Sequence, residues 1–370
     1  MSSITGGKIK ISVFGQSHSE AIGVVIDGLP AGVKIDFEEL GSFMARRAPG
    51  QRLSTPRKET DEFEILSGLA DGVTCGAPLC AVIRNSNTKP KDYSEFRHVP
   101  RPGHADYTAD IKYAGFNDIS GGGHFSGRLT APLCFAGGIA KQMLARIGVD
   151  ICAHLLSVGN VYDDAFDEVN VGYGDFEKIR NGGLPVLNGE AEVLIQALIE
   201  KTRAEKDSVG AVIECAAIGL PAGLGEPMFD SVESRVASLM FSVPAVKGVE
   251  FGAGFGAAVL KGSENNDLYR RSGDKIVTST NRCGGILGGI TNGMPMIFRA
   301  AFKPTPSIFK RQNTLDVSDG KIVELKIEGR HDPCVALRAV PVAEAAAAFT
   351  LLDLYCEYYA YKNLIDVFKG

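Results

Sequence analysis

The sequence Ala21-Ile-Gly-Val-Val-Ile-Asp-Gly28-Leu-Pro-Ala-Gly32 decides the fold, because its last five residues recur as Gly219-Leu-Pro-Ala-Gly223. Each copy follows an apolar, β-branched run that is typical of a strand and precedes a segment with apolar residues at helical spacing. Chance reuse of a favourable turn would explain the five shared residues alone. The repeated order of strand, turn and helix favours an internal duplication within an α+β fold.

Hydrophobic patterning predicts further elements on both sides of the repeat. Asp36 and Glu39 resemble a capping box, and the helix that follows should end near Arg47, before the breaker Pro49-Gly50. Since no low-complexity linker separates the halves, we expect one continuous domain over residues 1–370. The other predicted helices span residues 129–147, 191–205, 230–240 and 340–361, and the predicted strands span residues 8–14, 21–27, 78–84, 151–158, 209–218, 295–302 and 321–327.

Composition is that of a folded globular protein, with 45% hydrophobic and 22% charged residues and a net charge of −5. Such a chain offers no basic field to nucleic acid or to an anionic membrane. The polar start before Lys8 lacks the apolar core of a secretory signal, and Glu344 and Asp353 interrupt the most apolar stretch. We therefore expect a soluble, cytoplasmic protein that must bind any anionic ligand locally.

Glycine is abundant, with 44 of 370 residues, whereas an average protein has about 7%. Seven of these glycines lie in the runs at 121–123, 284–285 and 288–289, where backbone without a Cβ could approach a flat or anionic ligand. Tight turns are the simpler alternative. The eight cysteines are sparse and lie mostly in apolar segments, which predicts free, buried thiols.

Histidines are concentrated in polar, glycine-rich or aspartate-bearing loops, which hold His18, His104, His124 and His331. His154 lies inside a predicted strand, as a core histidine would, and His98 is expected at the surface. The segments Arg101-Pro-Gly-His-Ala-Asp106 and Arg330-His-Asp332 both place a histidine between an arginine and an acid. This repetition predicts a functional site.

Arginines occur in the same loops, at positions 46, 47, 52 and 57 and again at positions 101, 128, 330 and 338. Guanidinium groups bind phosphate and carboxylate through paired hydrogen bonds. Several arginines near the histidine motifs of an acidic protein therefore predict a small, multiply charged anionic ligand. A solvated surface run is the alternative for Arg46 and Arg47.

Motifs of other enzyme classes are absent or incomplete. Gly15-Gln-Ser-His-Ser19 follows a predicted strand, as a nucleophile elbow does, but it lacks the final glycine and the helix that should follow directly. Neither a Gly-x-Gly-x-x-Gly turn after a strand nor a nucleotide-phosphate loop is present, so a dinucleotide-binding or P-loop fold is not predicted.

Eight motifs in one order cover nearly the whole chain and together resemble the chorismate synthase family, although each would be weak alone. The motifs are Phe14-Gly-Gln-Ser-His-Ser19, Arg46-Arg-Ala-Pro-Gly50, Ser54-Thr-Pro-Arg-Lys-Glu59, Arg101-Pro-Gly-His-Ala-Asp106, Gly121-Gly-Gly-His-Phe-Ser-Gly-Arg128, Asn281-Arg-Cys-Gly-Gly-Ile-Leu-Gly-Gly289, Lys303-Pro-Thr-Pro-Ser307 and Gly329-Arg-His-Asp-Pro-Cys334. The resemblance implies a β-α-β sandwich, a homotetramer, and reduced flavin mononucleotide (FMN) as cofactor. The implied reaction is the trans-1,4 elimination of phosphate from 5-enolpyruvylshikimate 3-phosphate. It gives chorismate for aromatic amino acid biosynthesis, with no net redox change.

The resemblance also implies roles for single residues. His18 and His104 match the family's acids near the flavin and the leaving phosphate. Asp332 matches the aspartate that works with the flavin N5, and Ser17 matches its hydrogen-bonding neighbour. The matching contacts to substrate and NADP are Arg47 and Arg52. The matching flavin contacts are His124, Phe125, Ser126, Pro244, Ala245, Gly288, Lys303, Pro304, Thr305, Pro306, Ser307 and Arg330.

The chain departs from the family pattern at two motifs. Gln16 and Ser19 replace the usual Glu and Gly of Gly-Glu-Ser-His-Gly, and His124 stands where an arginine usually follows the three glycines. Backbone contacts at residue 124 do not depend on this change.

Two other classes remain as alternatives. A non-catalytic flavin- or anion-binding module would bind the same ligands without turnover. A metal-dependent phosphohydrolase would need metal ligands, but no histidine pair has metal-ligand spacing and no metal site is predicted. Its candidate ligands would be His18, His104, His331, Asp106 and Asp332.

Overall fold

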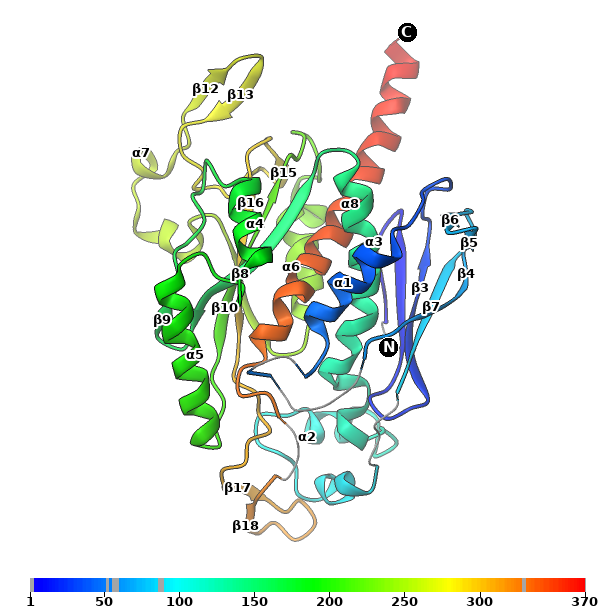
Figure 1. Ribbon diagram of the computed structural model, residues 1–370, viewed down its shortest axis with the longest axis vertical. Helices are drawn as coiled ribbons and strands as arrows, with labels where there is room; N and C mark the ends of the chain where they lie inside the picture. Colours follow the sequence, from blue (N-terminus) through cyan, green and yellow to red (C-terminus); the bar gives the residue numbers. More distant parts are fainter. Residues whose placement is uncertain (1–2, 51–52, 55–59, 86–89, 328–330, 370) are drawn as a thin grey trace.

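Two five-stranded antiparallel sheets face each other across a layer of helices, as Figure 1 shows. The computed structural model describes residues 3–50, 53–54, 60–85, 90–327 and 331–369. The first sheet has the strand order β1 (Ile4–Thr5), β2 (Lys10–Gly15), β3 (Ala21–Asp27), β7 (Leu79–Arg84) and β4 (Glu64–Ser67). The second has the order β11 (Val246–Phe251), β16 (Met296–Phe302), β10 (Ala211–Ile218), β8 (Asp150–Val158) and β9 (Val161–Tyr162).

The two sheets share one connectivity. The order β2-β3-β7-β4 of the first sheet corresponds to β8-β10-β16-β11 of the second. In each half the central strand leads through a Gly-Leu-Pro-Ala-Gly turn to a helix, α1 (Phe37–Arg47) or α6 (Val232–Ser242). In each half a later strand, β7 or β16, is followed by a long helix, α3 (Thr130–Ala145) or α8 (Ala336–Lys369).

The repeated turn needs its first glycine for the same reason in both halves. Gly28 and Gly219 have φ of +86° and +80°, a conformation that side chains disfavour. A Cβ on Gly28 would lie 2.2 Å from the Lys8 carbonyl oxygen, and one on Gly219 would lie 2.0 Å from the Gly148 carbonyl oxygen. The turn therefore crosses the backbone of the neighbouring chain segment at the same point in each half.

Helices α1, α3, α6 and α8 form the middle layer (Figure 1). Helix α3 packs on β3 of the first sheet, α8 packs on β8 and β10 of the second, and the two helices pack on each other. Their approach is close, because a Cβ on Gly137 would lie 2.3 Å from the Ala345 Cα. Small residues at this contact let the long helices bridge the sheets.

The buried acid Glu344 ties helix α8 to three other elements. Its carboxylate pairs with Arg46 of α1 at 2.6 Å and with Lys141 of α3, and it accepts a 3.2 Å hydrogen bond from the amide of Ala153 in β8. Burial alone would raise the pKa of Glu344, but Arg46 and Lys141 outweigh it and lower the pKa to about 2. The carboxylate is therefore charged and fully paired inside the core.

Asp353, two and a half turns further along α8, anchors the N-terminal strand region. It accepts hydrogen bonds from the amides of Gly7 at 2.7 Å and Ile9 at 2.8 Å, and it pairs with Arg235 of α6. By length and composition α8 could cross a membrane, but 89% of its most apolar window is buried inside the protein. It is the core helix of this fold.

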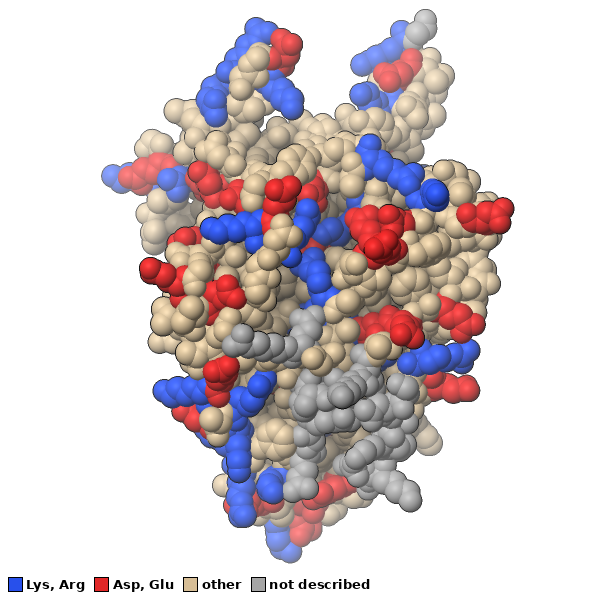
Figure 2. Space-filling model, in the orientation of Figure 1, with Lys and Arg blue, Asp and Glu red and all other residues tan. Residues whose placement is uncertain are grey.

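Two parts of the chain project from the body formed by the sheets and the middle layer. The hairpin of β12 (Tyr269–Ser272) and β13 (Lys275–Thr278) and the end of α8 extend away from the sheets (Figure 1). Figure 2 shows charges of both signs mixed over this face. The remaining elements are β5 (Leu69–Ala70), β6 (Val73–Thr74), β14 (Ile286–Leu287), β15 (Ile290–Thr291), β17 (Gln312–Leu315), β18 (Ile322–Leu325), α2 (Asp106–Lys112), α4 (Tyr173–Asn181), α5 (Gly189–Ala204), α7 (Gly262–Asn265) and the 3-10 helices η1 (Pro90–Arg97), η2 (Ser120–Phe125), η3 (Gly127–Leu129), η4 (Met228–Asp230) and η5 (Gly254–Val259).

Most predicted elements are present within a few residues of their expected ends. Asp36 caps α1 as predicted, accepting from the amides of Glu38 and Glu39. His154 is fully buried, bonded to Asp163 and Glu214, as predicted for a core histidine, and His98 is exposed. Two predictions were inexact: α8 begins at Ala336 and continues past residue 361, and only four of the eight cysteines are buried, since Cys75 is exposed and three are half-buried.

Replacing Glu344 by glutamine should lower the free energy of unfolding by about 3–5 kcal/mol, because Arg46 and Lys141 would lose their buried counter-charge. Chemical denaturation measures the loss. Glu324→Gln removes one partner of the exposed pair with Arg311, and it should cost less than about 1 kcal/mol. Equal losses in the two variants would contradict the role given to Glu344.

The difference in free energy of unfolding between wild type and Glu344→Gln should depend on pH in a defined direction. Because the pKa of Glu344 lies below its value in the unfolded chain, the stability it adds is present above pH 4.5 and is lost as the pH falls toward about 2. The difference between wild type and Glu344→Gln should therefore shrink on acidification.

Candidate active site

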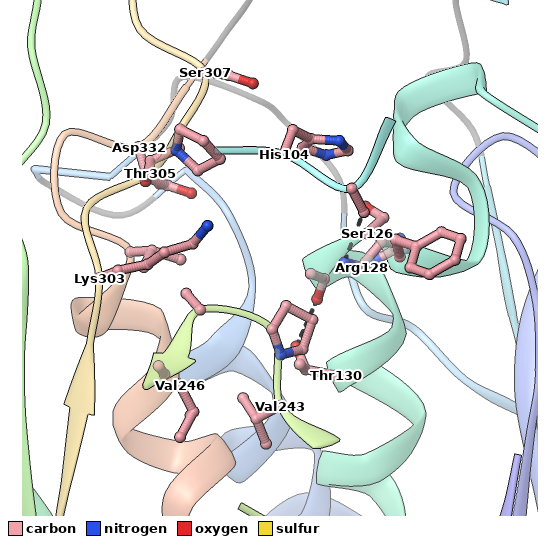
Figure 3. A pocket seen from close by; sticks show the side chains of 18 of the residues that line it. His104, Ser126, Arg128, Thr130, Val243, Val246, Lys303, Thr305, Ser307 and Asp332 are labelled. Carbon is pink, nitrogen blue, oxygen red and sulfur yellow. Dashed lines mark hydrogen bonds between the residues drawn. The ribbon is translucent and has the colours of Figure 1, made fainter. Parts of the chain in front are cut away.

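All four helices of the middle layer end at one cavity of about 560 Å³, which Figure 3 shows from close by. The N-terminal ends of α3 and α8 and the C-terminal ends of α1 and α6 meet here. Two helix N-termini favour negative charge through their aligned backbone dipoles. The cavity is lined by Arg47, Pro49, Tyr93, Arg101, Gly103, His104, Ala105, Gly121, His124, Phe125, Ser126, Gly127, Arg128, Thr130, Phe241, Ser242, Val243, Pro244, Ala245, Val246, Lys247, Lys303, Thr305, Pro306, Ser307, His331, Asp332, Val335, Arg338, Ala339 and Val342.

The lining is strongly cationic in a protein of net charge −5. Among the described residues one acid, Asp332, faces six cations: Arg47, Arg101, Arg128, Lys247, Lys303 and Arg338. Burial, together with the charge of Lys247, lowers the pKa of Lys303. Such an excess of positive charge in a walled cavity selects an anion with several negative charges.

A buried carboxylate behind the wall holds two of the arginines. Asp61 pairs with both Arg47 and Arg128, and only 1% of its side chain is exposed. Burial opposes its charge, but Arg47 and Arg128 lower the pKa of Asp61 below its usual value. The Arg47 Nε also donates to the Thr130 hydroxyl at 3.2 Å. These contacts fix the guanidinium groups before any ligand binds.

Asp332 is held in the same way by an arginine from the start of α8. Arg338 donates to the Asp332 carboxylate at 2.8 Å and to the Arg47 carbonyl oxygen at 3.0 Å. Arg338 therefore connects the predicted aspartate to the arginine cluster.

The triple-glycine turn passes between the predicted catalytic histidines. A Cβ on Gly121 would lie 2.1 Å from His18 Cε1 and 2.7 Å from the Ser17 hydroxyl oxygen. A Cβ on Gly122 would lie 3.2 Å from His104 Cε1 and Nε2. Because Gly121 and Gly122 have no side chains, the backbone of this turn can lie close to both imidazole rings. His18 also packs edge-on against Tyr93, at 5.2 Å between ring centroids.

The opposite wall consists of the loop after α6 and the segment after β16. In Figure 3, Lys303 and Thr305 lie across the cavity from Ser126 and Arg128, with Val243 and Val246 at its base. The Lys303 amide donates to the Ala245 carbonyl oxygen at 2.9 Å, and Ala245 has φ of +77°. A left-handed alanine costs about 1–2 kcal/mol, so this loop holds a strained conformation at the cavity.

Both ring nitrogens of His124 contact other residues of the protein. Its Nδ1 lies 2.9 Å from the Gly15 carbonyl oxygen, to which it must donate, and its Nε2 lies 3.2 Å from the Ser3 hydroxyl. The imidazole therefore links the glycine turn to the end of β2 and to Ser3 near the N-terminus. This is the structural use of the residue that departs from the family pattern.

The structure brings together most predicted site residues. Ser17 and His18 lie against Gly121 without lining the cavity, and Pro304 packs near Gly210. Gly288 lies in the β14–β15 turn and does not line this cavity. Arg52 and Arg330 lie outside the described residues. Twelve predicted residues line the cavity: Arg47, His104, His124, Phe125, Ser126, Pro244, Ala245, Lys303, Thr305, Pro306, Ser307 and Asp332.

Sequence reasoning missed Asp61, the carboxylate behind Arg47 and Arg128. Asp61 stands in a polar run, Glu59-Thr-Asp-Glu62, with no periodic pattern that marks it as buried. The only feature of the sequence that points to Asp61 is its position shortly after four arginines. Within the described ranges, no group of three His, Cys, Asp or Glu side chains is arranged to hold a metal ion.

The two-sheet fold and its cationic, histidine-bearing cavity define an enzyme for a small anionic substrate. Comparison with known proteins identifies the family, because the family model for chorismate synthase matches residues 9–356. The chain therefore belongs to the chorismate synthase family. Members of that family are lyases.

Individual relatives are similar to this chain over nearly its whole length. The chorismate synthase of Korarchaeum cryptofilum is 45% identical over 354 residues, covering 95% of this chain and 96% of the relative. That of Thermococcus kodakarensis is 44% identical, covering 97% and 99%. A crystal structure of chorismate synthase superposes with a TM-score of 0.75 at 26% identity, covering 95% of this chain and 93% of the other.

Gly121→Ala should displace Ser17 and His18, because the new methyl group has no room beside them. We expect turnover to fall about 10²-fold, as when a catalytic group moves by about 1 Å. Gly273→Ala is the control: its φ of +58° matches the +61° of Gly121, but no atom lies within 4 Å of a Cβ there. Denaturation should show a loss of about 1 kcal/mol for the control and a larger loss for Gly121→Ala. Similar stability and turnover in both would refute the crowded geometry.

Proposed function

We propose that this chain converts 5-enolpyruvylshikimate 3-phosphate to chorismate by trans-1,4 elimination of phosphate, using reduced FMN, in aromatic amino acid biosynthesis. The observation that carries the proposal is a cavity with six cations and His104 in its wall and His18 just behind it, in a chain that belongs to the chorismate synthase family. The substrate carries a phosphate and two carboxylates, so its charge complements this lining.

Departure of the phosphate requires positive charge and a proton. Arg47 and Arg128 are already oriented by Asp61, so they can stabilise the developing negative charge without reorganising. His104 is the proposed acid at this end of the cavity, and His18, with Ser17, is the second. The contact of Arg47 and Arg52 with NADP stays a prediction from the family.

The residues around the cavity fit a flavin. Val243, Pro244, Ala245 and Val246 offer an apolar surface to a flat ring, and the glycine turn on the other side leaves no room for a side chain at 121. Lys303, Thr305 and Ser307 provide polar groups for a phosphate-bearing tail. When bound, reduced FMN would supply the electron density that this elimination needs. Asp332, held by Arg338, would keep or move a proton beside it.

The wider organisation is also proposed. The matching strand orders and glycine turns of the two halves support an internal duplication within a single β-α-β sandwich domain. The homotetramer comes from the family resemblance. Exposed apolar residues on the two projections, Tyr269 at 68% and Phe368 at 85%, support association in general, since it would cover them. The family's biosynthetic role supports the proposed cytoplasmic location. The comparisons give no support to the phosphohydrolase alternative.

Under anaerobic conditions, reduced FMN and excess chelator should allow the enzyme to release phosphate and chorismate in equal amounts. Reduced flavin should be needed only in catalytic amount, because the elimination returns its electrons, and oxidised flavin should support no reaction. Absorbance of the diene and a phosphate assay measure the two products. Phosphate release without flavin, abolished by chelator and without diene, would establish the hydrolase instead. Ligand binding without turnover would indicate a binding module.

A further inference from the structure

Asp106 lies behind His104 at the first residue of α2, where only 4% of its side chain is exposed. Its Oδ1 is 2.6 Å from His104 Nδ1 and 2.7 Å from Arg101 Nη2. Its Oδ2 accepts from the Arg101 amide at 3.0 Å and from Arg101 Nε at 2.7 Å. The carboxylate therefore has four donors around it, three of them from one arginine.

These contacts determine where the imidazole carries its proton. Burial would raise the pKa of Asp106, but hydrogen bonds from Arg101 and His104 outweigh it and lower that pKa below its usual range. An ionised carboxylate can only accept, so His104 Nδ1 must be the donor across the 2.6 Å contact. Arg101 Nη2, 3.1 Å from the same nitrogen, is also a donor and offers it no acceptor.

The other ring nitrogen is on the cavity side. The Cε1–Nε2 edge of His104 faces Gly122, where a Cβ would lie 3.2 Å away, and the residue lines the cavity with 16% of its side chain exposed. One nitrogen is thus fixed by protein and the other is open to a ligand.

We propose that Asp106 is a positioning residue that keeps a proton on His104 Nδ1, so that Nε2 alone exchanges a proton with the bound ligand. When the ring acts as an acid, the Nε2–H bond breaks and the proton passes to an oxygen of the leaving group. The ring becomes neutral and keeps its proton on Nδ1, which still donates a hydrogen bond to the Asp106 carboxylate. The catalytic consequence rests on the proposed function, whereas the placement of the proton does not.

A purely structural role for Asp106 makes a different prediction. The carboxylate would then serve only to hold the Arg101 amide and the first turn of α2, and the neutral imidazole would be free to carry its proton on either nitrogen. The ring tautomer separates the two accounts, because it reports on Asp106 without any turnover.

Nitrogen NMR of protein labelled with ¹⁵N-histidine measures the tautomer directly, with the His104 signals assigned by their absence in His104→Gln. In the neutral His104 ring of the wild type, we expect a protonated Nδ1 and an unprotonated Nε2. A protonated Nε2 in the neutral ring would overturn the proposal, whatever the activity.

Asp106→Ala should release the ring to the Nε2-protonated form or to a mixture and reduce kcat about 10-fold or more. Asp110→Ala is the matched control, since Asp110 is on the same helix and pairs with Arg97 at 3.1 Å, away from the cavity. It should retain the wild-type tautomer and rate. A wild-type tautomer in folded Asp106→Ala would also overturn the proposal. If the wild type has the expected tautomer but forms no chorismate, the proposed function fails and this inference stands.

Discussion

The buried ion pairs of Glu344 determine how the two halves of the molecule meet. Helix α8 is alanine-rich and apolar over most of its buried length, so hydrophobic packing alone specifies its rotation and register weakly. One carboxylate that must reach Arg46 of α1, Lys141 of α3 and the backbone of β8 restricts both the rotation and the register of the helix. Asp353 adds the same constraint at the N-terminal strand region and α6. Because α3 and α8 both begin at the cavity, their fixed contact also fixes its cations relative to one another.

Buried carboxylates also organise the cavity, but here their cationic partners face the ligand side. Asp61 and Asp106 lie behind the wall, and the arginines and histidine that they hold face inward. The acids offset part of the cost of gathering like charges and leave the excess positive charge on the ligand side. This explains how a protein of net charge −5 can bind an anion without a basic surface. Shape and charge are therefore set before substrate enters, as electrostatic catalysis requires.

Sequence reasoning recovered what local patterns encode. The strand at 21–27, the Asp36 cap and the core position of His154 depend on neighbouring residues, and each was predicted. The ordered motifs identified the family and most cavity residues. The start of α8 was missed because Pro341 lies inside the helix, where proline usually ends one. The partners of Glu344 and Asp61 were not predictable, since those contacts join segments far apart in the chain that no periodicity relates.

The central claim is that the cations around this cavity bind the phosphate-bearing substrate. Calorimetric titration of 5-enolpyruvylshikimate 3-phosphate, in the presence of oxidised FMN so that no turnover occurs, tests it most directly. Arg128→Met should weaken binding about 10²-fold relative to wild type, because one charge-assisted contact is lost and Asp61 keeps only one of its two arginine partners. Wild-type affinity in a folded Arg128→Met protein would contradict the account.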